Sequence, residues 1–194
     1  MSQHYYTQEP TAAHDIRDIA FTARGRHFAL VTDAGTFSRE GLDRGSAILL
    51  EALPELSGAV LDLGCGWGAM GLVMAATMPE TRVTLSDVNL RSLETARRNA
   101  QTLGLDVTAV HSDGFAALSG PFDAIICNPP IRAGKAVTYA LYLGCREHLA
   151  AGGTAYFVIR KQQGAESATT FLKTLFSSVE RIAREAGYWV IACS

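Results

Sequence analysis

A polar turn after a buried strand is the first feature of this sequence with residue types suited to chemistry. Asn128, Pro129 and Pro130 follow directly after the apolar segment 124–127. Two consecutive prolines fix φ and remove two backbone N–H donors, so the turn presents carbonyl acceptors, and Asn128 adds a side-chain carbonyl oxygen. Two convergent acceptors fit both N–H groups of a planar exocyclic amine, and binding them would turn the nitrogen lone pair towards a group donor in a neighbouring pocket. Such a turn acts by positioning and charge stabilisation rather than as a strong base.

A glycine-rich segment predicts where that pocket lies. The segment Val60–Gly71 begins as a short apolar strand and continues with Gly64, Gly66 and Gly68, before a helix predicted over 69–77. Glycines let the backbone turn tightly and let a ligand approach main-chain N–H groups, so this pattern predicts a strand–loop–helix nucleotide site. The same spacing satisfies the dinucleotide fingerprint, and a glycine-rich turn without a ligand remains an alternative.

Two other residues of this segment have interpretations of their own. Asp62 interrupts an otherwise apolar strand, where a carboxylate is costly unless it has partners. It could orient the glycine loop and face the ligand's ammonium group, or it could cap N–H groups of the loop, and both can hold. Cys65 is expected to be a small buried spacer in the loop rather than a nucleophile.

Acidic residues follow the next two predicted strands. Asp87, followed by Val88, ends the second strand, where a carboxylate can accept both hydroxyls of a ribose in NAD or in S-adenosylmethionine. Asp113 ends the third strand and is followed by Gly114 and Phe115; its carboxylate can accept from the exocyclic amine of adenine, and the phenyl ring can cover the base. Dehydrogenases do not need this second acid, which favours S-adenosylmethionine. The Asn-Pro-Pro turn, which alone would be read as a loop terminator, then predicts N-methyl transfer.

The elements that must position these residues alternate along the chain. From residue 59 onward the sequence predicts, in turn, Val60–Leu63, Ala69–Thr77, Arg82–Ser86, Leu90–Leu103, Val107–His111, Phe122–Cys127, Val137–Leu149 and Thr154–Arg160. This alternation indicates βαβ units and a parallel sheet. A helix over 166–176 then precedes strands over 178–184 and 188–193, whose short connection forces an antiparallel pair. The predicted fold is α/β, doubly wound and Rossmann-like, with a mainly parallel sheet and an antiparallel C-terminal hairpin.

The first part of the chain precedes this alternation. After a polar start over 1–14, strands over 16–23 and 27–32 are predicted to form a β-hairpin through Arg24-Gly25-Arg26. The charged tip of this hairpin fits either solvation or a contact with RNA. A helix over 42–53 is ended by Pro54. We predict one domain over 1–194, with a hairpin and helix extension over 1–55 and the Rossmann-like core over 56–194.

Composition excludes some classes of protein. The net charge of −2 argues against a generally basic nucleic-acid binder, although the 17 Lys and Arg allow a local basic patch. The four cysteines are widely spaced and no signal peptide is evident, which predicts reduced thiols in a cytoplasmic protein. No run reaches the roughly 18 apolar residues of a membrane span. The five histidines have no ligand-like spacing, so no metal site is expected.

Together these motifs resemble those of class I S-adenosylmethionine-dependent methyltransferases. More narrowly, the chain is similar to the catalytic domain of bacterial small-subunit (16S) rRNA guanine-N2 methyltransferases, in the small methyltransferase domain family. The resemblance covers nearly the whole chain. It is carried by Gly35-Thr-Phe37-Ser38 ahead of Leu42-Asp43-Arg-Gly45, by Leu61-Asp-Leu-Gly-Cys-Gly-Trp-Gly68, and by Asn128-Pro-Pro-Ile-Arg-Ala-Gly-Lys135.

The resemblance implies a seven-stranded sheet, S-adenosylmethionine bound along the glycine loop, and Asn128 at the target amine. It also implies that the segment 37–45 helps to close the donor pocket. The expected cofactor-binding residues are Phe37, Asp62, Gly64, Cys65, Gly66, Gly68, Asp87, Val88, Asp113, Gly114, Phe115 and Asn128, and the expected catalytic residues are Asn128, Pro129 and Pro130.

Two departures from the family concern the substrate. Better-known members carry a second, degenerate methyltransferase-like half, for which this chain has no room; its contribution must come from elsewhere, for instance from a homodimer, or the substrate differs. The position after the two prolines is often aromatic, so a flipped base can stack on it, whereas Ile131 provides an apolar wall.

The cationic residues Arg132 and Lys135 follow this position. A cation at the start of a helix is unfavourable, which favours a substrate phosphate as the partner of Lys135, with Arg160 and Lys161 extending the same rim.

The predicted function is therefore methylation of the exocyclic N2 amine of a guanine in small-subunit ribosomal RNA. Protein glutamine-N5 and nucleic-acid adenine-N6 methyltransferases use the same turn, because each target presents an sp² nitrogen, and the motif alone does not separate them. A dehydrogenase and a non-catalytic RNA-binding module on this fold are further alternatives. The Arg-Ala-Gly-Lys continuation favours the ribosomal RNA group by resemblance alone.

Overall fold

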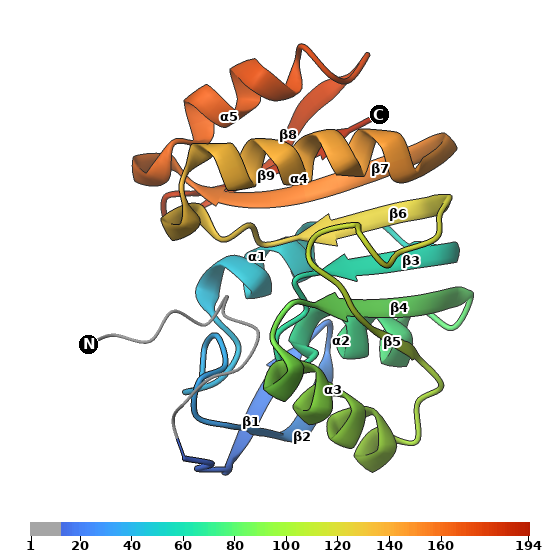
Figure 1. The fold of residues 1–194 in the computed structure, drawn as a ribbon, viewed down its shortest axis with the longest axis vertical. Helices are drawn as coiled ribbons and strands as arrows, with labels where there is room; N and C mark the ends of the chain where they lie inside the picture. Colours follow the sequence, from blue (N-terminus) through green and yellow to red (C-terminus); the bar gives the residue numbers. More distant parts are fainter. Residues whose placement is uncertain (1–12) are drawn as a thin grey trace.

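The computed structural model describes residues 13–194 (Figure 1), so the predicted irregular start over 1–14 lies almost wholly outside the described residues. A seven-stranded mixed sheet has the strand order β5-β4-β3-β6-β7-β9-β8. Its strands are β3 (Gly58–Leu63), β4 (Thr81–Asp87), β5 (Thr108–His111), β6 (Phe122–Cys127), β7 (Leu149–Arg160), β8 (Val179–Glu185) and β9 (Tyr188–Cys193). Strands β3 to β7 pair with one another in parallel, and β9 is antiparallel to both β7 and β8. This arrangement confirms the predicted fold class.

The central strands are apolar because both faces of the sheet are covered. Val60 and Leu61 of β3 and Ile125 and Ile126 of β6 are all 0 % exposed. Near-continuous apolar runs of this kind are typical of parallel strands between two layers of helices.

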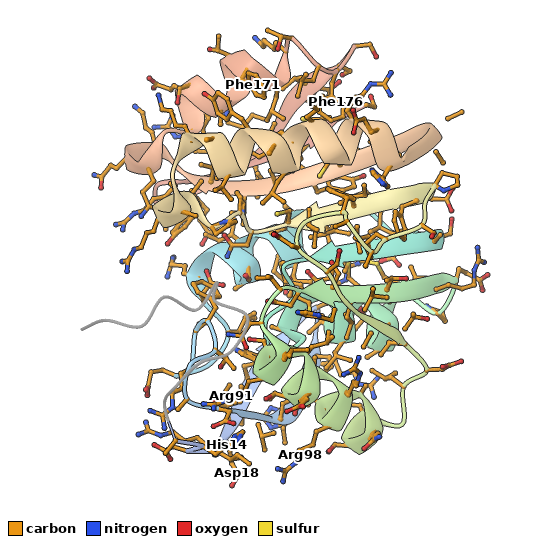
Figure 2. All side chains as sticks on the ribbon, in the orientation of Figure 1. His14, Asp18, Arg91, Arg98, Phe171 and Phe176 are labelled. Atoms are coloured by element: carbon orange, nitrogen blue, oxygen red, sulfur yellow. The ribbon has the colours of Figure 1, made fainter. Side chains whose placement is uncertain are left out.

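Five α-helices form those two layers. They are α1 (Arg44–Ala52), α2 (Ala69–Thr77), α3 (Leu90–Leu103), α4 (Lys135–His148) and α5 (Ala165–Leu172). The first three helices share one apolar cluster with one face of the sheet, and α4 and α5 share a second cluster with the other face. Phe171 of α5, which is labelled in Figure 2, stacks on Tyr139 of α4 with ring centroids 3.9 Å apart. This contact joins the two helices of the second layer.

The predicted N-terminal β-hairpin is present as a separate two-stranded sheet of β1 (Arg17–Ala23) and β2 (Arg26–Thr32). Arg24 and Gly25 at its turn both have positive φ, as a two-residue hairpin turn requires. The Arg24 guanidinium donates to the carbonyl oxygens of Leu50 and Leu53 at the end of α1, and that of Arg26 donates to Ala76 O at the end of α2. The charged tip is therefore bonded to helix carboxyl ends within the chain, where cations are favourable.

Several element boundaries differ from the sequence prediction, among them those of α1, α4, β7 and α5. Helix α1 begins at Arg44 rather than at residue 42, because the Asp43 side chain caps it by accepting from Gly45 N and Ser46 N. Leu149 opens β7 instead of ending α4, since it pairs with Phe122 of β6. Helix α5 ends at Leu172, four residues before the predicted end at 176.

No helix among residues 13–194 is long and apolar enough to cross a membrane. Within the same residues, no three His, Cys, Asp or Glu side chains gather in a way that could hold a metal ion.

Candidate active site

The glycine loop and the Asn-Pro-Pro turn leave the sheet side by side. Leu63 at the end of β3 pairs with Cys127 at the end of β6, so the segments that follow these two strands start from adjacent positions at the carboxyl edge. The strand order reverses direction between β3 and β6, since β4 lies on one side of β3 and β7 on the far side of β6. Ligands of open α/β sheets bind at such a switch point.

The glycine loop is tied to the neighbouring strand through its backbone. Gly64 N and Cys65 N both donate to Ser86 O of β4 at 2.9 Å. Gly68, which precedes α2, has φ +91°, and a Cβ there would lie 2.9 Å from the Leu72 side chain. The loop therefore needs glycine at its last position for both backbone conformation and space.

Asp62, on the strand that leads into the glycine loop, binds the backbone that follows the loop. Its side chain is 0 % exposed, and Oδ2 accepts a hydrogen bond from Gly71 N in the first turn of α2 at 2.7 Å. Oδ1 has no hydrogen-bond partner among the described residues. Burial, together with the smaller effect of the nearby Asp87 charge, raises the pKa of this carboxyl to about 7, against the hydrogen bond from Gly71 N. The capping interpretation thus describes the observed contact, and the side chain does not line the cavity.

Asp87 ends β4 with both carboxylate oxygens oriented by backbone donors. Oδ2 accepts from Gly66 N and Oδ1 from Asn89 N, each at 2.8 Å. Burial raises the pKa of Asp87, and the backbone hydrogen bonds from Asn89, Gly66 and Val88 oppose that rise. A carboxylate oxygen can accept more than one hydrogen bond, so this fixed carboxylate keeps acceptor capacity for the two hydroxyls of a ribose.

A cavity of about 740 Å³ lies at this edge of the sheet and brings most of the predicted site residues together. The predicted residues in its lining are Phe37, Gly64, Gly66, Asp87, Val88, Asp113, Gly114, Asn128, Pro129, Pro130, Ile131 and Arg132. Those that lie outside the lining are Asp62, Cys65, Gly68, Phe115, Lys135 and Lys161. The volume lies within the usual range of small-molecule and cofactor pockets.

Phe115 occupies a different position from the one expected of a ring that covers adenine. Its ring stacks on His148 at the end of α4 with centroids 4.4 Å apart, and a Cβ at Gly144 would meet it at 2.4 Å. The apolar wall beside Asp113 is instead lined by Leu141 of α4.

Asn128 is half-buried and held by side chains of the extension. Its Nδ2 donates to Ser46 Oγ at 3.1 Å and to the carboxylate of Asp43 at 3.3 and 3.4 Å. Because both contacts use the amide nitrogen, the side-chain carbonyl oxygen is the end of Asn128 that remains for a ligand in the cavity.

The segment 33–38, which lines the cavity with Thr36, Phe37 and Ser38, is fixed by α3. Asn89 Nδ2 donates to Gly35 O at 3.1 Å, and the Arg91 guanidinium donates to Ala34 O at 2.9 Å. Figure 2 shows Arg91 at the side of the molecule where the hairpin β1–β2 lies. The extension therefore forms one wall of the cavity.

The sequence interpretation left out several lining residues. They are Thr36, Ser38, Leu63, Ser86, Ser92, Ser112, Ala133, Val137, Leu141, Val158, Gln163 and Tyr188. Arg160, expected only on the rim, lines the cavity as well, and its guanidinium lies 5.9 Å from the ring centroid of Tyr188. Tyr188 opens β9 and reaches the cavity only because β9 lies between β7 and β8, which no local motif encodes.

Comparisons with known proteins agree with this geometry. The family model described as methyltransferase small domain matches residues 27–192. An uncharacterized protein of Bacillus subtilis, YbxB, is 37 % identical over 196 residues, which cover 98 % of each chain. Ribosomal RNA small subunit methyltransferase C of Serratia proteamaculans is 40 % identical over 124 residues, which cover 61 % of this chain and 36 % of that relative. The chain thus aligns with little more than a third of that curated relative.

A solved structure is similar over almost the whole chain. The 16S rRNA N2 methyltransferase of T. thermophilus, in complex with AdoMet (S-adenosylmethionine) and guanosine, superposes with a TM-score of 0.83 at 27 % identity, over 95 % of this chain and 52 % of that one. Because the family match runs from β2 to β9, the chain belongs to the methyltransferase small domain family and is a class I S-adenosylmethionine-dependent methyltransferase.

Proposed function

We propose that this methyltransferase methylates the exocyclic N2 amine of a guanine in small-subunit ribosomal RNA. The observation that carries the proposal is the orientation of Asn128, whose amide nitrogen is bound by Asp43 and Ser46 while its carbonyl oxygen is left for the cavity. An acceptor at this place fits an amine substrate and does not fit a carboxylate or phosphate nucleophile.

The cavity residues fit S-adenosylmethionine as the donor. The Asp87 carboxylate, held by Gly66 N and Asn89 N, is the acceptor for the ribose hydroxyls, and Asp113 is an exposed carboxylate in the lining for the exocyclic amine of adenine. When bound, S-adenosylmethionine supplies a methyl group activated by its sulfonium charge. The protein's own contribution is to bind and align donor and amine.

The target amine would be held at the turn after β6. Asn128 Oδ1 and the backbone carbonyl of the turn accept its two N–H groups, which aims the nitrogen lone pair at the donor pocket. Pro130 and Ile131 form an apolar wall beside it, and the cationic side chains of Arg132 and Arg160 lie in the same lining. Arginine is the side chain that pairs with O6 and N7 of guanine, so the charge of this wall fits guanine better than adenine.

Two named similarities support RNA as the substrate. The Serratia relative is described as a ribosomal RNA small subunit methyltransferase, and the T. thermophilus structure is a complex of a 16S rRNA N2 methyltransferase with guanosine. Lys135 at the start of α4 is exposed just beyond the cavity, where an RNA phosphate would neutralise it.

The test is transfer of isotope-labelled methyl from S-adenosylmethionine to unmethylated small-subunit particles, followed by digestion and identification of the labelled nucleoside. We expect N2-methylguanosine from the wild type and a loss of at least about a hundredfold in rate for Asn128→Ala. The matched control is Gln101→Ala, which removes an exposed amide on α3. Label in N6-methyladenosine, or in protein glutamine offered as a competing substrate, would replace the proposal with the corresponding activity.

A further inference from the structure

Asp43 contacts two functional parts of the molecule with one carboxylate. As the N-cap of α1, its Oδ1 accepts hydrogen bonds from Gly45 N at 2.9 Å and Ser46 N at 3.3 Å. Both of its oxygens also lie within hydrogen-bond distance of Asn128 Nδ2, and Ser46 Oγ accepts from the same nitrogen. The first turn of α1 is thereby joined to the catalytic turn after β6.

The chemistry of these partners decides which end of the Asn128 amide faces them. A carboxylate accepts hydrogen bonds and donates none, so only the NH₂ end of the amide can face Asp43. In a flipped amide, Oδ1 would meet the carboxylate oxygens and two acceptors would repel each other. No described residue donates to Asn128 Oδ1, so this oxygen is the acceptor that remains for a ligand in the cavity.

We propose that Asp43, assisted by Ser46, is the positioning residue that holds Asn128 in the orientation required to accept the target amine, an inference that rests on the proposed function of Asn128. The Asp43 charge also polarises the amide. A negative charge beside the NH₂ group shifts electron density towards the carbonyl oxygen and makes it a stronger acceptor in a half-buried site.

A purely structural role for Asp43 as a helix cap predicts different behaviour on substitution. Asparagine is as good an N-cap as aspartate, so Asp43→Asn retains the helix. The amide oxygen of the variant takes the place of Asp43 Oδ1 and keeps the cap. Its NH₂ group takes the place of Oδ2 and sets a donor against Asn128 Nδ2, where the carboxylate offers an acceptor at 3.3 Å. The substitution therefore separates the capping role from the positioning role.

The kinetic test compares kcat with KM for the two substrates. We expect Asp43→Asn to lower kcat roughly tenfold to a hundredfold, as loss of orientation does, with little change in KM for S-adenosylmethionine and in Tm. Asp106→Asn, an exposed carboxylate in the loop before β5, is the matched control. A kcat of Asp43→Asn within twofold of the wild type overturns the proposal.

A reciprocal exchange makes the test specific to the pair. Asn128→Asp alone sets a second carboxylate against Asp43, and the like charges oppose each other, so kcat falls. Asp43→Asn combined with Asn128→Asp restores one donor and one acceptor in reversed order and leaves a carboxylate oxygen for the amine. We expect the double variant to exceed both single variants in kcat. A double variant no better than the poorer single variant contradicts the positioning role.

A second measurement needs no methyl-accepting substrate. In the ¹⁵N spectrum of the protein, the side-chain NH₂ resonances of Asn128, assigned through Asn128→Ala, are expected to shift and to exchange faster with solvent in Asp43→Asn but not in Asp106→Asn. Unchanged resonances overturn the proposal. If the wild type methylates no small-subunit particles while these resonances respond as expected, the proposed substrate fails and the positioning contact stands.

Discussion

A carboxyl group as deeply buried as Asp62 costs free energy when it ionises, because one of its oxygens has no donor among the described residues. The contact with Gly71 N needs only an oxygen acceptor, which a neutral group also supplies. Asp62 thus combines a structural contact with a negative charge that the described residues around it do not stabilise.

This burial predicts a pH dependence of stability. The pKa of Asp62 rises from 3.8 to about 7 on folding. Between these values the native state holds a proton that the unfolded state has lost, so stability falls as the pH rises through this window and is constant above it. Asp62→Asn keeps an acceptor for Gly71 N and carries no charge. We expect the difference in Tm between Asp62→Asn and the wild type to increase from pH 4 to pH 8 in thermal melts. Asp106→Asn serves as the control. Parallel curves of Tm against pH for Asp62→Asn and the wild type would contradict this prediction.

The residues that sequence reasoning placed in the cavity share one property. Gly64 and Asn128 directly follow strands and Asp87 ends one, and the carboxyl ends of parallel strands must meet at one edge of a sheet. Tyr188 carries no such signal, since it begins a strand. Phe115 follows a strand as well, yet its ring packs on His148, because the side-chain packing of α4 is a long-range property.

At the scale of elements, the hairpin β1–β2 is attached to the core through the carboxyl ends of helices. Arg24 Nη1 donates to two carbonyl oxygens at the end of α1, and its side chain is only 15 % exposed. Carbonyl groups at a helix end have no intrahelical partner, so this cation satisfies groups that water would otherwise have to reach.

We expect Arg24→Ala to lower the free energy of unfolding by about 1–3 kcal/mol, since charge-assisted hydrogen bonds to Leu50 O and Leu53 O are lost. Denaturant unfolding followed by circular dichroism measures the change. Arg98→Ala, which removes an exposed arginine of α3, is expected to change it by less than about 0.5 kcal/mol. Equal effects of the two substitutions would show that the helix-end contacts contribute nothing.

Sequence patterns located every α-helix and β-strand of the described chain but not all of their ends, and they did not predict the two short 3₁₀ helices over Ile131–Ala133 and Lys161–Gln163. The start of α1 depends on which polar residue caps it. Asp43 is that cap, so the helix begins at Arg44, two residues after the predicted start. The early start of β7 depends on pairing between Leu149 and Phe122, a tertiary contact that overrides the helical pattern of the preceding residues. Order within the sheet was predictable only in part, because the insertion of β9 between β7 and β8 follows from no local signal.

At the scale of the whole molecule, donor binding is expected to stabilise the fold. A ligand that binds only the native state adds about 2.7 kcal/mol at a concentration of 100 Kd. We expect S-adenosylmethionine to raise Tm and NADH to leave it unchanged in a thermal shift assay. Asp87→Ala is expected to weaken donor binding by at least about 1.5 kcal/mol, roughly tenfold in Kd. A shift with NADH alone would indicate the dehydrogenase alternative.

The net charge of −2 requires any RNA contact to be local. Lys135, exposed at the first position of α4, is unfavourable for that helix, so its replacement costs no stability. Lys135→Glu is expected to weaken RNA binding and to reduce the slope of log K against log salt by about one unit, as loss of one phosphate contact does. Arg98→Glu on α3 is the matched change of charge; identical slopes for wild type and Lys135→Glu would exclude the phosphate contact.

The carboxylate shared by the first turn of α1 and the Asn-Pro-Pro turn has a consequence for heat tolerance. End turns of helices open locally at free energies far below that of global unfolding. When the first turn of α1 opens, Asp43 and Ser46 leave Asn128 and the amide is free to rotate. Turnover is then expected to decline on warming while the buried sheet is still intact, so that the temperature of half-maximal activity lies below Tm and reports the fraying of a single helical turn.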